Sequence, residues 1–330
     1  MRTIGIDVSK GTLDVALWNE TGRVQEQQVK NTAASLKALL RKWCKQQLCE
    51  VDTLVCLEPT GHYSHGVIKT LLELGHPTWL AHATDIRLSM GMQRAKSDKV
   101  DARRIAEYAM RFHDKARLLD TSYLSFTELK NLLALRERLV KERAKDRAQL
   151  KDNVHYMEGT TRTLVKKELQ RQLKALDRSI AKLEEAIEAF LQKDQQIAQK
   201  NRLAQTVTGV GPVLASELIA HTEGFTRFES PRQLVCYVGA APFQKTSGSS
   251  VRGKTSTSSF ANKRLKSLFK LAALAAIRKS GDLRDYYLRK IQQGKRPSVA
   301  LNNVAAKIIH HLWAVINNNQ PYKPYYLHKS

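Results

Sequence analysis

Residues 2–30, RTIGIDVSKGTLDVALWNETGRVQEQQVK, decide the fold of this chain. The segment RTIGIDV has the pattern of a buried strand, and TLDVALW and GRVQEQQVK have the pattern of two more strands. The turn sequence NETG joins the second strand to the third. Since short turns connect antiparallel neighbours, the stretch predicts three antiparallel strands in succession.

Outward from this stretch, helices alternate with strands. Helices are expected over residues 31–49, 62–74 and 83–94, and strands over DTLVCLE (52–58) and PTWLAHA (77–83). Three antiparallel strands followed by two that return after helices are typical of an RNase H-like fold. In that fold the first and fourth strands lie side by side.

Four carboxylates stand where a metal-dependent enzyme that acts on nucleic acid needs them. Asp7 lies in the first expected strand and Glu58 ends the fourth. Asp98 and Asp101 lie three residues apart in KSDKVDARRIAEYA, so a helix would present them on one face. Carboxylate oxygens are the ligands that Mg²⁺ prefers, and a pair of such ions promotes phosphoryl transfer. The four acids therefore predict a site for one or two Mg²⁺ ions, which Mn²⁺ can replace, although each acid alone also fits a strand end, a loop or a helix cap.

The charge of the chain indicates its partner. The 330 residues carry a formal net charge of +24, and residues 201–330 alone hold 20 basic and 5 acidic side chains. Such a polycation attracts phosphate backbones through the release of counterions, so the expected partner is DNA or RNA. We expect no membrane association, because no apolar run approaches the roughly 18 residues of a span and the N-terminus lacks a signal-peptide pattern. The expected location is the cytoplasm.

Residues 123–192 are expected to form two long helices with a break near Gly159. Their second half has apolar residues at alternating steps of four and three, which is a heptad seam of about three repeats: Leu169, Leu173, Leu176, Ile180, Leu183, Ile187 and Phe190. The pattern fits an antiparallel hairpin within the chain, an intermolecular coiled coil, or both. A homodimer or homotetramer joined through the coiled coil is slightly favoured, because a lone two-helix arm would expose much of this stripe.

The C-terminal part has two features that fit a nucleic-acid partner. Gly209 and Gly211, in VTGVGPVLASELIA, resemble the turn of a helix-hairpin-helix element whose amides face a DNA phosphate, or they simply begin a helix at Pro212. The polar stretch KTSGSSVRGKTSTSSF, residues 245–260, is expected to be a mobile loop. Helical patterns that are basic on one side follow over residues 260–278 and 297–316.

Five motifs together carry a resemblance to a known family. The sequence IGIDVSK is followed by LEPTG, SDKVDARRIAEYA, TGVGPVLASELIA and GAAPFQKTSGSSVRGK. In this respect the chain resembles the bridge-RNA-guided DEDD transposases of bacterial insertion sequences, which are similar to the Piv-type site-specific invertases. The resemblance spans nearly the whole chain. It implies a RuvC-like catalytic domain over residues 1–115, a helical coiled-coil arm over 116–200, and a mainly α transposase domain with a serine loop over 201–330.

The resemblance also implies roles for individual residues. Asp7, Glu58, Asp98 and Asp101 would be the metal ligands, and Ser247 would be the nucleophile. Ser247 would attack a DNA phosphate to give a covalent phosphoserine and a free 3′ hydroxyl, after which strands of donor and target DNA are exchanged and religated under a guide RNA. The acids of one subunit are expected to act with the serine loop of another. Candidate nucleic-acid contacts in the C-terminal region are Gly209, Gly211, Gly248, Arg252, Lys254, Lys263 and Arg264.

The residues themselves leave alternatives open. Sequence chemistry alone does not choose Ser247 over its neighbours Thr246, Ser249 and Ser250. A RuvC-like junction endonuclease, in which metal-bound water cleaves DNA and the serine is idle, uses the same acids. A scaffold without catalytic activity, which binds nucleic acid through the basic region and assembles through the long helices, also fits the composition.

Overall fold

The computed structural model describes residues 1–89, 98–152, 154–243, 246–247, 251–252, 256–257 and 260–325. The chain divides into two compact units, residues 1–125 and 126–330, and each is described by itself. The division expected from the sequence, at residues 115 and 200, stays a prediction. Within the second unit, the ends of the long helices share one hydrophobic core with the helices that follow.

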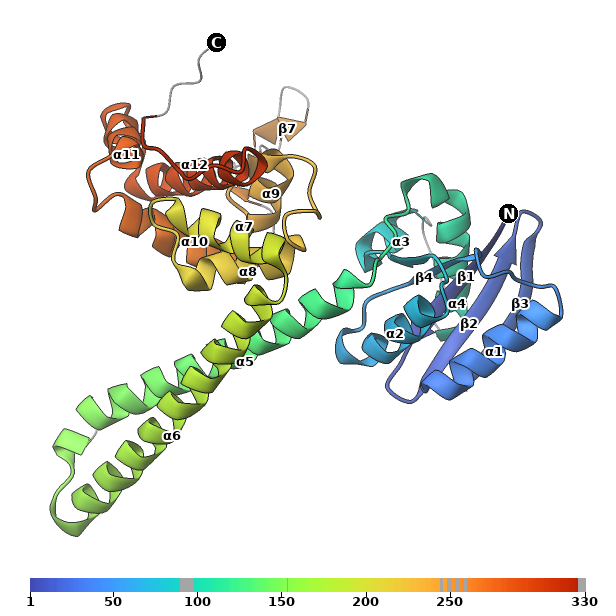
Figure 1. Cartoon of the computed structure of the whole chain (residues 1–330), viewed down its shortest axis with the longest axis horizontal. Coiled ribbons are helices and arrows are strands. Elements are labelled where there is room, and N and C mark those ends of the chain that lie inside the picture. The colour runs from blue at the N-terminus through green and yellow to red at the C-terminus, as the bar shows by residue number, and fades with distance from the viewer. Residues whose placement is uncertain are drawn as a thin grey trace. The chain divides into compact units, whose positions relative to one another are not determined.

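The first unit contains a five-stranded mixed sheet (Figure 1). Strands β1 and β2 pair antiparallel, as do β2 and β3, whereas β1 pairs parallel with β4 and β4 parallel with β5. The order across the sheet is β3-β2-β1-β4-β5, so the first and fourth strands are neighbours, as the sequence predicts. The strands are β1 Arg2–Val8, β2 Thr12–Asn19, β3 Gly22–Lys30, β4 Leu54–Leu57 and β5 Thr78–Leu80. This topology is compatible with an RNase H-like domain.

Helices cover both faces of this sheet. The face that carries Ile4, Ile6 and Leu57 packs on the apolar sides of α1 and α2, and the opposite face packs on α4. Thr32 begins α1 as the sequence suggests, because its side chain accepts a hydrogen bond from the backbone N–H of Ser35. The helices are α1 Ala33–Lys45, η1 Gly61–Ser64, α2 His65–Glu73, α3 Ala83–Ser89, α4 Asp98–Arg111 and η2 His113–Lys115.

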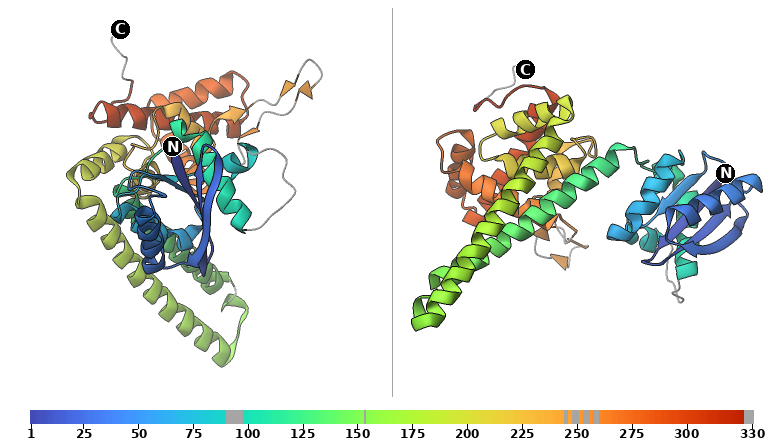
Figure 2. Two further views of the ribbon diagram at one scale, coloured as in Figure 1. Left: turned by 90° about the vertical axis from the view of Figure 1, so that its right-hand side faces the viewer. Right: turned by 60° about the horizontal axis from the view of Figure 1, so that its bottom comes forward.

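Two long helices, α5 (Ser122–Asp152) and α6 (Gly159–Gln192), run antiparallel as a hairpin joined through η3 (Val154–Tyr156) (Figures 1 and 2). Ion pairs cross between them: Arg136 Nε donates to Glu184 Oε1 at 2.9 Å, and Arg143 donates to Asp177 Oδ1 at 2.8 Å. The heptad seam of α6 is buried or half-buried along its length, with Ile180 only 3% exposed. Much of the stripe is therefore covered within one chain.

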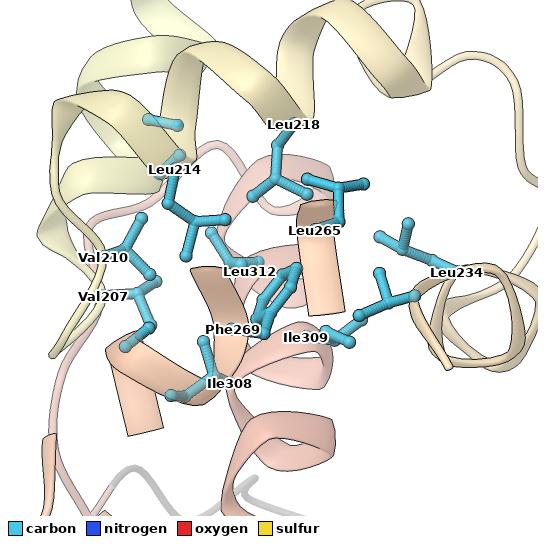
Figure 3. Packing of buried hydrophobic residues seen from close by; sticks show 14 of the residues in the cluster. Val207, Val210, Leu214, Leu218, Leu234, Leu265, Phe269, Ile308, Ile309 and Leu312 are labelled. Atoms are coloured by element: carbon cyan, nitrogen blue, oxygen red, sulfur yellow. The ribbon is translucent and has the colours of Figure 1, made fainter. Parts of the chain in front are cut away.

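Helices α7–α12 pack around one hydrophobic core. Figure 3 shows part of this core. Phe269 of α10 and Ile308 of α12 lie in it fully buried. By length and composition α12 would pass as a membrane span, although the sequence predicts no apolar run of that length. Half of its apolar window is buried inside the structure. A helix that is buried in a core on several sides is apolar around much of its circumference, so it can resemble a membrane span in composition. The helices are α7 Gln195–Thr206, α8 Pro212–Thr222, α9 Pro231–Val238, α10 Lys263–Ala276, α11 Asp282–Gln292 and α12 Pro297–Asn317.

The sequence predicts a mobile loop here, but the described part of the serine-rich stretch forms short strand pairs, and its mobility stays a prediction. Strand β6 (Pro242–Phe243) pairs antiparallel with β9 (Ser256–Thr257), and β7 (Thr246–Ser247) pairs antiparallel with β8 (Val251–Arg252). The β7–β8 pair lies between β6 and β9 in the sequence, so the two pairs are nested along the chain. Pairs of two residues carry too little alternation to be recognised in a sequence.

Candidate active site

Two of the expected acids come together because β1 and β4 are parallel neighbours. Their register pairs Thr3 with Leu54 and ends with Ile6 opposite Leu57. Asp7 follows Ile6 and Glu58 follows Leu57, so each acid is the next residue along its strand. Both backbones therefore reach the same edge of the sheet, at the carboxyl ends of the parallel strands, where sites in open sheets are commonly found.

Alternation along β1 directs Asp7 toward α4. Thr3 Oγ1 donates to the backbone carbonyl of Ala106 in α4 at 2.8 Å. A Cβ atom on Gly5 would lie 2.3 Å from the carbonyl oxygen of Ala102, so strand and helix backbones touch at this glycine. Asp7 is on the same face, since every second side chain of a strand points the same way. Asp101 immediately precedes Ala102 on α4, which brings a third carboxylate to this edge.

The carboxylates of Glu58 and Asp101 interact electrostatically. Burial raises the pKa of Glu58 above its ordinary value, the negative charge of Asp101 raises that pKa further, and His82 opposes the shift. Asp101 is also held by Arg104, whose guanidinium donates to Asp101 Oδ1 at 2.8 Å. Two acids that repel each other at a partly buried edge are stabilised by a cation between them.

The fit of the site to a metal ion rests on its donor chemistry. Asp98 is the first residue of α4, three positions before Asp101, and its side chain lies outside the described residues. Among the described side chains, no group of three or more His, Cys, Asp or Glu residues is close enough to hold a metal ion. The available donors are carboxylate oxygens, which suit hard divalent cations.

Sequence reasoning missed a further acid, Asp14, beside this site. Asp14 lies directly opposite Asp7 in the β1–β2 register and is only 3% exposed. Directly opposed residues of antiparallel strands share a face, with Cβ atoms about 5 Å apart. The Gln28 side-chain amide donates to both carboxylate oxygens of Asp14, at 3.1 and 3.0 Å. The signal was an acid inside the apolar run TLDVALW, at a position where alternation faces it inward.

The predicted nucleophile Ser247 has only its backbone described. It lies in β7, opposite Val251 of β8. The side chains of Ser247 and Arg252 lie outside the described residues, as do Gly248 and Lys254 entirely. The roles of these four residues stay predictions.

Among the predicted nucleic-acid contacts, two have structural partners. Gly209 has φ +89°, and a Cβ atom there would lie 2.3 Å from the carbonyl oxygen of Ala272, so the glycine allows α10 to pack closely. Arg264 Nε donates to Glu217 Oε1 at 2.9 Å, and its NH1 lies 3.0 Å from Glu137 Oε1. These contacts account for both residues without nucleic acid.

Two other predicted contacts are exposed. Gly211 precedes α8 as its N-cap, with open space around it, and Lys263 at the start of α10 faces solvent. Both remain available to a phosphate.

A mixed sheet with helices on both faces and carboxylates at the ends of two adjacent parallel strands is compatible with an RNase H-like enzyme. Two family profiles agree with this class. One, of DEDD transposases and described as "Transposase", matches residues 4–157, and the other, "Transposase IS116/IS110/IS902 family", matches residues 201–288.

Individual relatives carry related names. The pilin gene-inverting protein of Moraxella lacunata is 24% identical over 97% of both chains. The transposase for insertion sequence element IS1111A of Coxiella burnetii is 24% identical over 98% of this chain and 92% of its own. An insertion element IS116 protein of Streptomyces clavuligerus is 29% identical over 157 residues. The matched part is 48% of this chain and only 38% of that relative.

The chain therefore carries transposase domains of the IS110/IS116/IS902 family, whose members are enzymes that act on DNA. The sequence expectation of a transposase or recombinase is confirmed at this level. Membership of a DEDD transposase family also indicates a general requirement for a divalent metal.

Proposed function

We propose that this chain is an RNA-guided DNA transposase in which Ser247 is the nucleophile and the acidic edge of the first unit assists the phosphoryl transfer. The observation that carries the proposal is that Asp7 and Glu58 lie at the carboxyl ends of two adjacent parallel strands, where the negative charge of Asp101 also raises the pKa of Glu58. Mg²⁺ is the proposed metal, held by these three acids and Asp98, with Mn²⁺ as a substitute. A bound divalent ion neutralises charge that develops on the phosphate oxygens.

The proposed chemistry conserves the energy of the broken bond. The Ser247 oxygen forms a bond to phosphorus, the bond from phosphorus to the 3′ oxygen breaks, and that oxygen takes up a proton as a free 3′ hydroxyl. The 3′ hydroxyl of the exchanged strand then attacks the phosphoserine and releases the serine hydroxyl. No phosphodiester energy is lost to water, because the covalent link stores it. The names of the inverting and transposing relatives support strand exchange over simple cleavage.

The proposed partners are donor DNA, target DNA and a guide RNA. The excess of 20 basic over 5 acidic side chains in residues 201–330 supports binding to nucleic acid of either kind. RNA guidance rests on the family resemblance, and a guide that pairs with the target leaves few bases for side chains to read. We also propose a homodimer or homotetramer in the bacterial cytoplasm.

A denaturing gel tests the nucleophile. With labelled DNA, Mg²⁺ and copurified RNA, the proposal expects a covalent protein–DNA adduct that Ser247→Ala abolishes and the matched variant Ser249→Ala leaves intact. Metal-dependent nicking that survives Ser247→Ala would instead establish a water-driven junction endonuclease. Binding without any strand breakage would leave only a scaffold. Sequencing of the copurified RNA tests guidance, and random host RNA would count against it.

A further inference from the structure

The strongest feature outside the acidic edge is a cavity of about 520 Å³ in the second unit. Its walls are one face of α11, one face of α12 and the chain that follows α12 to Tyr325. Asp282, Asp285, Tyr286 and Arg289 recur at helical spacing on α11, so they share that face. The volume is within the usual range of small-ligand sites.

Two hydrogen bonds fasten the C-terminal segment across the cavity. The Tyr322 hydroxyl donates to Asp282 Oδ1, and the Tyr325 hydroxyl donates to Asp285 Oδ2 at 2.5 Å. Two of the five acids in residues 201–330 are used here. Attachment of residues 322–325 to α11 explains these two tyrosine–aspartate hydrogen bonds, but it does not explain the cations beside them.

The cations gather around one aromatic ring. Lys307 Nζ lies 4.8 Å from the centre of the Tyr286 ring, Arg289 lies 5.4 Å from it and Lys290 lies 5.5 Å from it. No carboxylate in the described part of the chain forms an ion pair with Arg289 or Lys307. Lys323 adds a further positive charge to the lining, and Tyr325 stays 62% exposed at the rim. One exposed ring and cations without an ion-pair partner are thus combined in one cavity.

We propose that this cavity, the α11–α12 pocket, binds one nucleotide unit of a single-stranded nucleic acid. A base stacks on the exposed ring of Tyr325, and Arg289 and Lys307 contact the flanking phosphates. The Asp285 carboxylate, at the rim of α11, accepts a hydrogen bond from a base amino group. The proposal rests on the proposed action on nucleic acid, and deepens it by naming where an unpaired strand is held.

Other ligands fit the pocket less well. An acidic peptide would satisfy the cations but would be repelled by Asp282 and Asp285. A free ammonium ligand would compete with Lys307, which already lies over the Tyr286 ring. Duplex DNA hides the faces of its bases, whereas single strands offer them for stacking. RNA and single-stranded DNA share the chemistry that the pocket recognises, so an experiment has to separate these two sources.

Binding of a labelled six-nucleotide strand to the full chain, followed by fluorescence anisotropy in EDTA, tests the pocket. Tyr325→Ala is expected to weaken binding about tenfold, since stacking of one base carries such an effect. Tyr325→Phe keeps the ring but loses the hydrogen bond to Asp285, and is expected to bind nearly as well as the unmodified chain. Equal weakening of binding in both variants would show that Tyr325 only attaches its own segment to α11, and this would overturn the proposal. Unchanged binding in both variants would also overturn it.

Charge is tested with two arginines of the same helix. The logarithm of the affinity falls as the logarithm of the salt concentration rises. Arg289→Gln is expected to make this negative slope less steep by about 0.7, the value for one phosphate contact of a single strand. Arg284→Gln removes the same charge from another face of α11 and is expected to leave the slope unchanged. Equal effects of the two variants would indicate general attraction and sink the pocket. Stronger displacement of the labelled strand by polyglutamate than by unlabelled strand would favour an acidic protein partner and overturn the proposal.

Two arms complete the design. RNA and DNA strands of one sequence are compared, and a photoreactive base is expected to crosslink within residues 282–325, whichever sugar binds more tightly. Crosslinks confined to other segments would overturn the proposal. Because EDTA prevents metal-assisted transfer, these measurements do not depend on Ser247 chemistry. If no covalent adduct forms but the strand binds as expected, only the proposed mechanism is contradicted. If the adduct forms but the pocket variants bind the strand normally, only the pocket is contradicted.

Discussion

At the scale of single residues, the acidic edge contains two acids in different surroundings: the negative charge of Glu58 is disfavoured, whereas Asp14 is stabilised by hydrogen bonds. Glu58 has its pKa raised by burial and by Asp101, whereas the buried Asp14 accepts two hydrogen bonds from Gln28. The sequence predicted the four family acids from their positions at strand and helix ends. It did not predict Asp14, because only the antiparallel register places that residue opposite Asp7.

The raised pKa of Glu58 predicts a pH-dependent cost of folding in the absence of metal. Below its ordinary pKa, Glu58 is protonated in both folded and unfolded chains and contributes nothing. As the pH rises through the raised folded value, the unfolded chain releases the proton more readily, so stability falls. Glu58→Gln is therefore expected to raise the Tm in EDTA at pH 7 and to have no effect near pH 4. Calorimetry of the full chain measures both.

Glu73 provides the opposite control. It is exposed, and its hydrogen bond and charge interaction with Lys37 hold its pKa below the ordinary value. Glu73→Gln is expected to lower the Tm slightly at pH 7 rather than to raise it. Added Mg²⁺ should stabilise the unmodified chain more than Glu58→Gln, because a ligand that binds the folded state raises its stability. Identical Mg²⁺ responses in the two chains would remove Glu58 from the metal site.

Asp14 is predicted to support metal binding by its charge. Asp14→Asn keeps an oxygen for Gln28 but removes a negative charge opposite Asp7, so the Mg²⁺-induced rise in Tm should shrink without vanishing. Asp7→Asn should abolish that rise. Asp85→Asn, which removes an exposed acid from α3 of the same unit, should leave it unchanged. If Asp14→Asn and Asp85→Asn behave alike, Asp14 is only a structural residue.

At the scale of elements, the site depends on how closely α4 packs on β1. The sequence predicted the five strands and the helices of the first unit because their hydrophobic periods are clear. The contact at Gly5 was not predictable, since nothing in IGIDVSK states which helix will approach it. The same holds for Gly209, where the sequence suggested a phosphate contact and the structure shows close packing on α10.

Gly5→Ala is expected to separate α4 from β1. The added methyl group would lie 2.3 Å from backbone atoms of Ala102 and Ala106, which cannot move as a flexible side chain does. Overpacking of this kind costs about 1–3 kcal/mol, measurable by urea unfolding, and should also reduce the Mg²⁺ response. Gly66→Ala, in α2 with open space around it, is expected to be neutral or stabilising by about 0.5–1 kcal/mol. Equal losses at the two sites would contradict the close contact.

The long hairpin yields a prediction about assembly. Ile180→Ala is expected to cost about 2–5 kcal/mol, because Ile180 is buried within one chain, whereas Leu164→Ala on the exposed end of α6 should cost little. Thermal unfolding at several protein concentrations decides whether the seam also joins subunits. A Tm that rises with protein concentration would show that subunits associate, whereas a Tm that does not change would show that the seam is satisfied within one chain.

At the scale of the whole molecule, the proposed chemistry is divided between two units. The acids lie in residues 1–125 and Ser247 lies in residues 126–330. The motifs and the resemblance predicted this division, which stays a prediction, and transposase profiles match residues 4–157 and 201–288. It did not predict the α11–α12 pocket, since hydrogen bonds between residues forty positions apart leave no periodic signal.

Mixed subunits test whether the divided site acts between chains. Asp7→Asn retains the serine and Ser247→Ala retains the acids, so each variant alone is expected to form no covalent adduct with DNA. If the acids of one subunit assist the serine of another, mixing the two variants restores adduct formation. The adduct should then appear only on the Asp7→Asn chain, which a size tag identifies on a denaturing gel. A mixture of Asp7→Asn with the double variant Asp7→Asn/Ser247→Ala should stay inactive, because no chain in it has the intact acids. Failure of the first mixture, in a chain shown to exchange subunits, would place both halves of the chemistry within one chain.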